Sequence, residues 1–122
     1  MDENSYKLEQ QLHTLQKQQR AAEDTLLLLK REQNEQEWLE EDFTRHCQLE
    51  METITSLREL WQGDEARNFA YYLEDIHEEE KKNWRKNMVS KREKQQEKIN
   101  SCQKTLYQIE REQQSIQKEL TR

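Results

Sequence analysis

The sequence predicts an all-α protein, a long antiparallel two-helix hairpin (coiled coil) with a tight turn at Trp61-Gln62-Gly63. Gly63 is the only glycine of the 122-residue chain, it stands close to the midpoint, and the chain contains no proline. The residues on either side are rich in Glu, Gln, Lys, Arg and Leu, which are good helix formers. Apolar residues recur at the seven-residue interval of a coiled coil, and this interval distinguishes a packed hairpin from a disordered chain of similar composition.

We expect the first helix over about residues 4–60, the turn over 61–64 and the second helix over about 65–120, within a single hairpin domain that covers 1–122. Glycine adopts the positive φ that ends a helix without a steric penalty, so Gly63 can stop the first helix. Asp64 can then cap the second helix, because its carboxylate can accept hydrogen bonds from the free amides of the first turn.

The first helix carries two interleaved series of residues at seven-residue spacing. One series is Leu8, Leu15, Ala22, Leu29, Phe43 and Leu57. The other is Leu12, Leu26, Cys47, Ile54 and Trp61, with the polar Gln19, Gln33 and Glu40 at intervening positions. In the second helix the two series are Ile99, Leu106 and Leu120, and Cys102, Ile109 and Ile116. These series predict the helix–helix interface.

Folding the chain about Gly63 brings the two sets of interface residues together in one register. The predicted partners are Leu8 with Leu120, Leu12 with Ile116, Ala22 with Leu106, Leu26 with Cys102, and Leu29 with Ile99. The two residue numbers of every pair add up to 128, so a single antiparallel alignment forms all these layers. The seven-residue spacing predicts left-handed packing.

Opposite charges follow the same register. Residues 81–98 contain eight Lys and Arg residues and only two Glu. The segment predicted to lie opposite, residues 30–47, contains six acidic residues against three Lys and Arg. The basic stretch is therefore interpreted as the partner of this acidic segment within the hairpin, and the alternative is a basic patch that binds phosphate groups or acidic surfaces.

Apolar residues near the turn outnumber the positions of a two-helix interface. The spacing in the second helix also slips between Ile76 and Met88, so a single stripe cannot gather all of them. Surplus aromatic and methionine residues are typical of association surfaces, although single exposed apolar residues also occur on ordinary surfaces. The predicted partner-binding residues are Trp38, Leu49, Met51, Phe69, Tyr71, Tyr72, Trp84 and Met88.

One motif could carry metal chemistry. Glu74 and His77 form a Glu-x-x-His pair, which ligates di-iron centres in some four-helix bundles. Glu50 is expected at a similar height on the first helix, and a homodimer would double the set. The three glutamates at 78–80 favour the simpler interpretation of a solvated acidic face. The sequence has no glycine-rich phosphate loop and no nucleophile beside a base, so we expect no catalytic residue, no cofactor and no bound metal.

The composition disfavours several functional classes. Hydrophobic residues make up 31% of the chain and charged residues 38%, too little apolar material for a thick globular core. The net charge of −6 disfavours a nucleic-acid partner. No stretch approaches the roughly 18–20 apolar residues of a membrane span and no signal peptide is visible, so we expect no membrane insertion and a cytoplasmic location.

The two cysteines are predicted to be free thiols. In the hairpin register Cys47 and Cys102 lie about 30 Å apart along the helices, whereas a disulfide bridges Cα atoms within about 7 Å. Both are most simply small interface residues of a reduced, cytoplasmic protein.

A helical hairpin with Trp61-Gln62-Gly63 at its turn resembles the Trp-x-Gly proteins of bacterial type VII secretion. The longer and more charged arms are more similar to the small α-helical accessory proteins found with LXG toxins in Gram-positive bacteria. This resemblance implies binding to the helical LXG domain of a larger toxin before export, with a second small helical accessory protein as a further partner. The export signal of the Trp-x-Gly family, Tyr-x-x-x-Asp/Glu, occurs as Tyr71 and Asp75, just after the turn instead of near the end of the second helix.

We therefore expect a non-enzymatic targeting factor or chaperone that binds the helical N-terminal domain of an LXG toxin for type VII secretion, and that stays in the cytoplasm or leaves with its partner. The alternative is a structural coiled coil, similar to the stalk-like hairpins of flagellar and type III export ATPases. A stalk requires a self-sufficient interface, whereas an adaptor requires an additional apolar face. The surplus Trp38, Tyr72 and Trp84 favour the adaptor.

Overall fold

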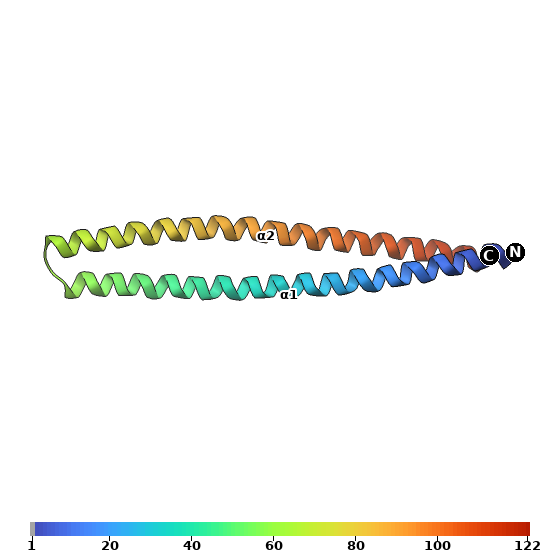
Figure 1. Ribbon diagram of the computed structural model, residues 1–122, viewed down its shortest axis with the longest axis horizontal. Coiled ribbons are helices and arrows are strands. Elements are labelled where there is room, and N and C mark those ends of the chain that lie inside the picture. The colour runs from blue at the N-terminus through green and yellow to red at the C-terminus, as the bar shows by residue number, and fades with distance from the viewer. Residues whose placement is uncertain (1) are drawn as a thin grey trace. The chain divides into compact units, whose positions relative to one another are not determined.

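The computed structural model describes residues 2–122 and confirms the predicted all-α hairpin. Helix α1 spans Asp2–Leu60 and helix α2 spans Asp64–Leu120, and no strand occurs in the described part of the chain. The two helices pack against each other in antiparallel directions, and the chain reverses after α1 (Figure 1). The helix bounds differ by at most two residues from those expected from the sequence.

The reversal takes place in three residues, and Gly63 supplies its backbone geometry. The amide of Trp61 donates to the Leu57 carbonyl at 3.0 Å, which closes the last turn of α1. Gly63 has a φ of 123°, a conformation that side-chain-bearing residues rarely adopt. The amide of Arg67 donates to the Gly63 carbonyl at 3.0 Å, so Gly63 occupies the N-cap and Asp64 is the first helical residue. Asp64 therefore does not occupy the N-cap position that the sequence predicts for it. It lies in the acidic first turn of α2, where the helix dipole favours its negative charge.

We expect Gly63→Val to destabilise the hairpin by about 1–3 kcal/mol, because a β-branched residue is strained at this φ. A Cβ atom at position 63 would meet no other atom within 4 Å, so the loss would come from the backbone alone. Urea unfolding followed by circular dichroism measures it, with Gln62→Val as the matched control. Equal stability of the two variants would show that position 63 does not need a positive φ.

The helix–helix contacts divide into two compact units. The first unit consists of residues 2–33 and 94–122. Its interface buries Leu15, Ile99 and Ile109. The predicted partners Leu8, Leu12, Ala22, Leu26, Leu29, Cys102, Leu106, Ile116 and Leu120 are half-buried.

Polar side chains extend the interface of the first unit across the two helices. The Cys102 thiol donates to the Ala22 carbonyl at 3.2 Å, and Gln113 Nε2 donates to Gln19 Oε1 at 2.9 Å. Gln33 Nε2 donates to Gln96 Oε1 at 3.2 Å. Each of these partners lies within four residues, about one helical turn, of the position that the predicted register places opposite.

The second unit, Asn34–Glu93, contains the turn and a different mixture of residues. It buries Cys47, Ile54, Ala66 and Ala70, together with the polar Gln36 and His77. Trp61, which the sequence places in the interface, is 48% exposed at the end of α1, because the chain leaves the helix there. The remaining interface positions are half-buried: Glu40, Phe43, Glu50, Leu57, Leu73, Trp84 and Met88.

Helix α2 changes its interface spacing in the second unit. The positions that face α1 include Ala66, His77 and Met88, which are eleven residues apart, and Leu73 and Trp84, which are also eleven apart. An eleven-residue interval corresponds to 3.67 residues per turn, whereas the seven-residue interval of α1 corresponds to 3.5. This change explains the slip predicted between Ile76 and Met88. None of the described helices contains a segment long and apolar enough to cross a membrane.

Candidate functional site

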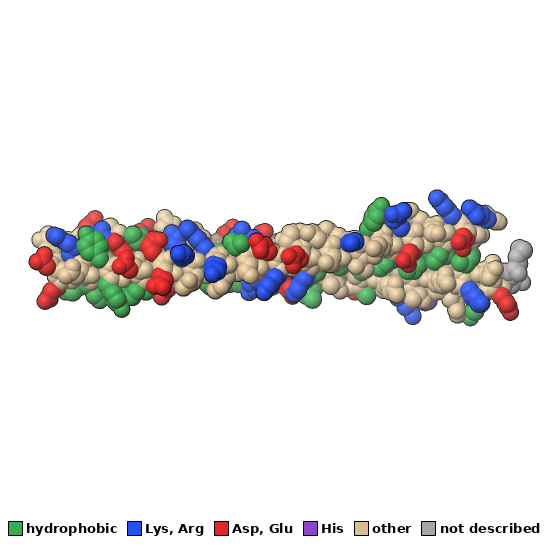
Figure 2. All heavy atoms as spheres, turned by 90° about the horizontal axis from the view of Figure 1, so that it is seen from above, with side chains coloured by type: hydrophobic (Ala, Val, Ile, Leu, Met, Phe, Trp, Pro, Cys, Tyr) green, Lys and Arg blue, Asp and Glu red, His purple; other side chains and the backbone are tan. Residues whose placement is uncertain are grey.

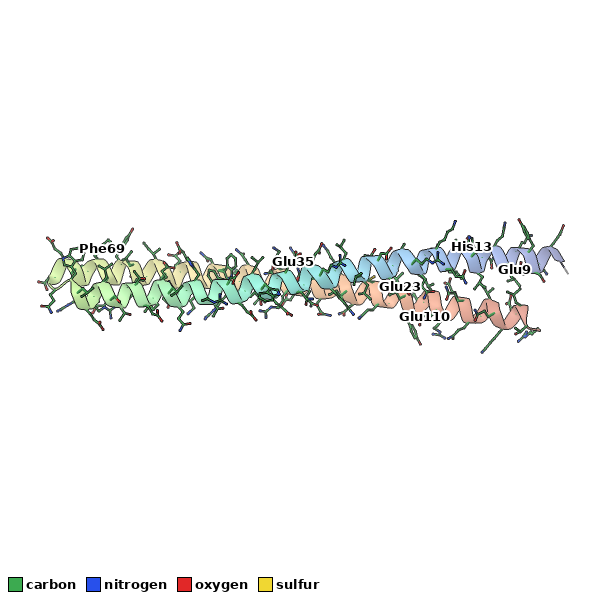
Figure 3. The ribbon with its side chains drawn as sticks, turned by 90° about the horizontal axis from the view of Figure 1, so that it is seen from below. Glu9, His13, Glu23, Glu35, Phe69 and Glu110 are labelled. Carbon is green, nitrogen blue, oxygen red and sulfur yellow. The ribbon has the colours of Figure 1, made fainter. Side chains whose placement is uncertain are left out.

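Several of the exposed large apolar side chains of the second unit lie beside the turn. Leu60 is 86% exposed at the end of α1, and Trp61 follows it directly. On α2, Phe69 and Tyr72 are three residues apart and therefore neighbours on one helix face. Phe69 is exposed near the turn (Figure 3) and its ring meets that of Trp61 edge-on, with centroids 6.0 Å apart and an interplanar angle of 65°. We call these four residues the turn-end face.

The turn-end face has the chemistry of a contact surface. All four side chains are exposed, and none of them is charged. The edge-on contact between Trp61 and Phe69 places two apolar rings next to each other on this surface. Exposed apolar residues that adjoin one another in this way are typical of interaction sites, whereas scattered ones are not.

A groove of about 450 Å³ lies between α1 and α2 within the second unit. Phe43, Cys47, Met51 and Met88 supply its apolar lining, and Thr44, Gln48, His77, Glu78, Lys81 and Arg85 supply its polar lining. The lining therefore combines apolar and uncharged polar side chains from both helices with one acidic and two basic side chains from α2. Such a groove suits the side of an amphipathic helix or peptide better than a small rigid ligand.

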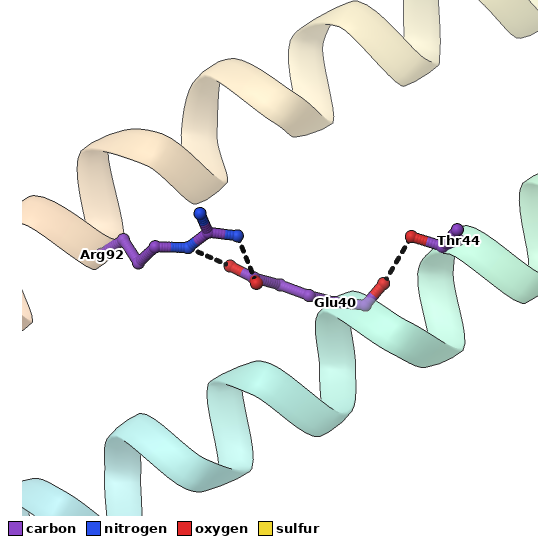
Figure 4. A network of polar contacts seen from close by, with 3 residues as sticks. All are labelled: Glu40, Thr44 and Arg92. Atoms are coloured by element: carbon purple, nitrogen blue, oxygen red, sulfur yellow. Dashed lines mark hydrogen bonds and ion pairs between the residues drawn. The ribbon is translucent and has the colours of Figure 1, made fainter.

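Two cross-helix ion pairs stand at either end of this groove along the helices. Towards the turn, Arg58 of α1 pairs with Glu74 of α2, and its guanidinium also lies over the Tyr71 ring, 5.5 Å from the centroid. Away from the turn, Arg92 holds the Glu40 carboxylate with two contacts, of which the Nε to Oε1 hydrogen bond measures 2.9 Å (Figure 4). Both pairs hold α1 and α2 in one register.

Two further features involve the residues of the second ion pair. Thr44 Oγ1 donates to the Glu40 carbonyl at 2.9 Å, one turn further along α1 (Figure 4). The hydrogen bond with the Glu40 carboxylate, followed by its negative charge, raises the pKa of Arg92 above the ordinary value.

His77 is the most buried polar side chain of the second unit, at 3% exposure. Its Nδ1 lies 3.3 Å from Glu50 Oε2 on α1, an arrangement that becomes an ion pair when the imidazole is protonated. Cys47 lies in the same groove, and burial raises the pKa of its thiol, an effect that the positive charge of Lys81 offsets only in part. A thiol held in the neutral form is a poor nucleophile, so this Cys and His do not make an activated pair.

The Glu-x-x-His motif does not converge on one point. Glu74 turns to Arg58, whereas His77 turns to Glu50, so the two residues of the motif have different partners. Among residues 2–122, no three His, Cys, Asp or Glu side chains are placed to hold a metal ion. The absence of metal and of catalysis stays a prediction.

Two of the predicted partner-binding residues lie in the hairpin's own interface. The Trp84 ring stacks on Phe43 of α1, with centroids 4.2 Å apart and an interplanar angle of 19°. Its Nε1 is buried and has no hydrogen-bond partner. Met88 is half-buried beside it and lines the groove. Their eleven-residue spacing from Leu73 and His77 is the signal in the sequence that identifies them as interface residues.

The other predicted partner-binding residues are exposed at different places on the second unit. Trp38 and Leu49 lie on α1 away from the interface, and Met51 forms part of the groove. Tyr71 is exposed but lies under the Arg58 guanidinium. Asp75, the second residue of the export-signal-like pair, is exposed one turn further along α2.

The basic stretch 81–98 is mostly free of direct ion pairs. Among its eight Lys and Arg residues, only Arg92 has an acidic partner within 4.0 Å in the described part of the chain. The remaining side chains are exposed, except for the half-buried Lys81. Figure 2 shows Lys and Arg side chains projecting from the surface. The predicted charge pairing within the hairpin therefore rests on one close contact and on the longer-range attraction between oppositely charged segments.

Comparison of the chain with protein-family models, curated proteins and solved structures returns no match.

Proposed function

We propose that this protein is a non-enzymatic helical targeting factor or chaperone that binds the helical N-terminal domain of an LXG toxin for type VII secretion. The observation that carries the proposal is the turn-end face. Leu60 and Tyr72 stay exposed there although α1 and α2 already bury Ile54, Ala66 and Ala70 between them. A hairpin with a filled interface has no structural use for additional large apolar side chains at its closed end.

The shape of the turn-end face favours a helical partner. Trp61 at the turn meets Phe69 of α2, and the three-residue spacing of Phe69 and Tyr72 matches the anchor spacing of a helix that packs against a helix. The absence of charge on these four side chains lowers the cost of removing water from the contact. Binding in the cytoplasm would shield the face until export, and the groove leaves a second surface for another small helical accessory protein.

The turn motif supports the choice of partner. Trp61 and Gly63 stand at the turn of the hairpin, as in the Trp-x-Gly proteins that the sequence resembles, and Trp61 is part of the exposed face. The partner's identity rests on this resemblance, and the existence of a binding face rests on the exposed residues.

Co-expression tests the proposal. We expect the tagged full-length chain to retain the helical N-terminal domain of an LXG toxin encoded beside it, in a stoichiometric complex that survives size-exclusion chromatography. The chain with both Leu60→Glu and Tyr72→Glu should lose the domain while its circular dichroism is unchanged, because both positions are exposed. A wild-type chain that retains no toxin domain would contradict the proposal and favour the structural coiled coil.

A further inference from the structure

The side of α1 that points away from α2 carries an ordered series of exposed residues within the second unit. Trp38, Asp42, Arg45 and Leu49 follow one another at intervals of four, three and four residues, so they lie on one line along the helix. All four are exposed, and Trp38 reaches 69%. The α1 residues that face α2, such as Gln36 and Cys47, lie on the other side of the helix. We call the four residues the outer stripe.

Among the described residues, none on α2 forms an ion pair, ring contact or cation contact with a side chain of the outer stripe. Asp42 and Arg45 approach each other at 3.9 Å, but both side chains are about two-thirds exposed, and such a pair within one helix contributes little. Trp38 has no ring partner or cation partner among the described residues, and its large apolar surface is left in water.

The order of the four residues suits an antiparallel pair of α1 helices, because each residue then lies opposite one with which it can pack or form an ion pair. We propose that a second copy of this chain docks on the outer stripe, with the two α1 helices antiparallel about a two-fold axis between positions 43 and 44. Trp38 then packs on Leu49 of the second copy, and Asp42 meets Arg45 of the second copy. Every contact occurs twice, as a closed two-fold interface requires.

The residues next to the stripe place charge differently. The alignment brings Asn34 level with Thr53 and Glu41 level with His46 of the second copy, whereas Glu35 comes level with Glu52 of the second copy, so the opposite charges that favour dimerisation are those of Asp42 and Arg45. A parallel alignment would instead place Asp42 on Asp42 and Arg45 on Arg45. The spacing of eleven residues between Trp38 and Leu49 is close to three full helical turns, so the two helices can stay in contact without bending.

The inference is independent of the proposed function, because the outer stripe shares no residue with the turn-end face. A partner bound at the turn and a second copy bound at the outer stripe can be present together. The outer stripe therefore predicts that the chain is a dimer before it meets any other protein.

Sedimentation equilibrium of the full-length chain over roughly 1–200 μM tests this inference. We expect a reversible monomer–dimer equilibrium, and we expect Trp38→Ala to raise the dimer dissociation constant about 30-fold or more, because each dimer loses two central aromatic anchors. Tyr107→Ala, which truncates an aromatic residue of similar exposure on α2, is the matched control and should leave the equilibrium unchanged. A wild-type chain that stays monomeric at the highest concentration would overturn the inference.

A charge swap tests the antiparallel alignment itself. The chain with Asp42→Arg and the chain with Arg45→Asp should each be monomeric, because like charges face each other twice in either homodimer. An equimolar mixture should dimerise, since both ion pairs are restored between unlike copies. Asp75→Arg, at an exposed position of α2, is the control and should dimerise like the wild type. Failure of the mixture to dimerise, or normal dimers of Trp38→Ala, would overturn the proposed interface.

Discussion

Ala70→Arg is expected to unfold the second unit, with a loss of more than about 3 kcal/mol. Ala70 is 0% exposed on α2 and Ala66, one turn earlier, is 2% exposed, so two small residues let α2 approach α1 closely next to the turn. A guanidinium at position 70 would be buried without a partner for its charge. Because Arg and Ala have similar helix propensities, the loss would come from packing and from the buried charge.

Ala21→Arg is the matched control, because Ala21 is exposed on α1 and the same substitution there should change stability by less than about 0.5 kcal/mol. All three tryptophans of the chain lie in the second unit, so their fluorescence during urea unfolding reports on that unit. If the Ala70 and Ala21 variants unfold at the same urea concentration, α1 and α2 do not pack closely beside the turn in solution.

The main features of the fold could be predicted from the sequence because the interface is periodic. Seven-residue spacing selects one face of α1, and the lone Gly63 places the reversal, so the register follows from counting. The position of the cap could not be predicted in the same way. Asp64 and Gly63 can both precede a helix, and only the backbone geometry shows that the Gly63 carbonyl accepts the first helical hydrogen bond.

The candidate site was harder to predict for a physical reason. Near the turn, apolar residues outnumber interface positions, and α2 changes there from seven-residue to eleven-residue spacing. Trp84 and Tyr72 are both aromatic residues of α2, but the changed spacing turns Trp84 onto Phe43 and leaves Tyr72 in solvent. The composition shows that apolar residues outnumber interface positions. Which of them are exposed depends on how α2 is rotated about its axis relative to α1.

The same reasoning applies to charge. The opposing segments 30–47 and 81–98 carry opposite signs, which favours one alignment of the helices at long range. Close ion pairs also require that both side chains reach one point, and within the basic stretch only Arg92 meets that condition, with Glu40. A charge pattern in the sequence therefore predicts register better than it predicts individual salt bridges.

Tyr72→Ala is expected to weaken binding of the toxin's helical domain about 30-fold or more, equivalent to about 2 kcal/mol or more for one lost aromatic anchor. Tyr72 is suited to this test because it is 61% exposed and makes no aromatic or cation contact with the residues that the structure describes. Its truncation should therefore leave the hairpin's helicity and unfolding midpoint unchanged. Isothermal titration calorimetry of the purified domain against each variant measures the effect.

Tyr107→Ala provides the matched control for this measurement. Tyr107 also lies on α2 and is 60% exposed, but it belongs to the first unit and not to the turn-end face. Removing the same amount of exposed aromatic surface there should leave the affinity within about twofold of the wild type, since residues outside a contact contribute little to binding. Equal losses at positions 72 and 107 would mean that the partner has no preference for the turn-end face, and unchanged affinity at position 72 would place the docking surface elsewhere on the chain.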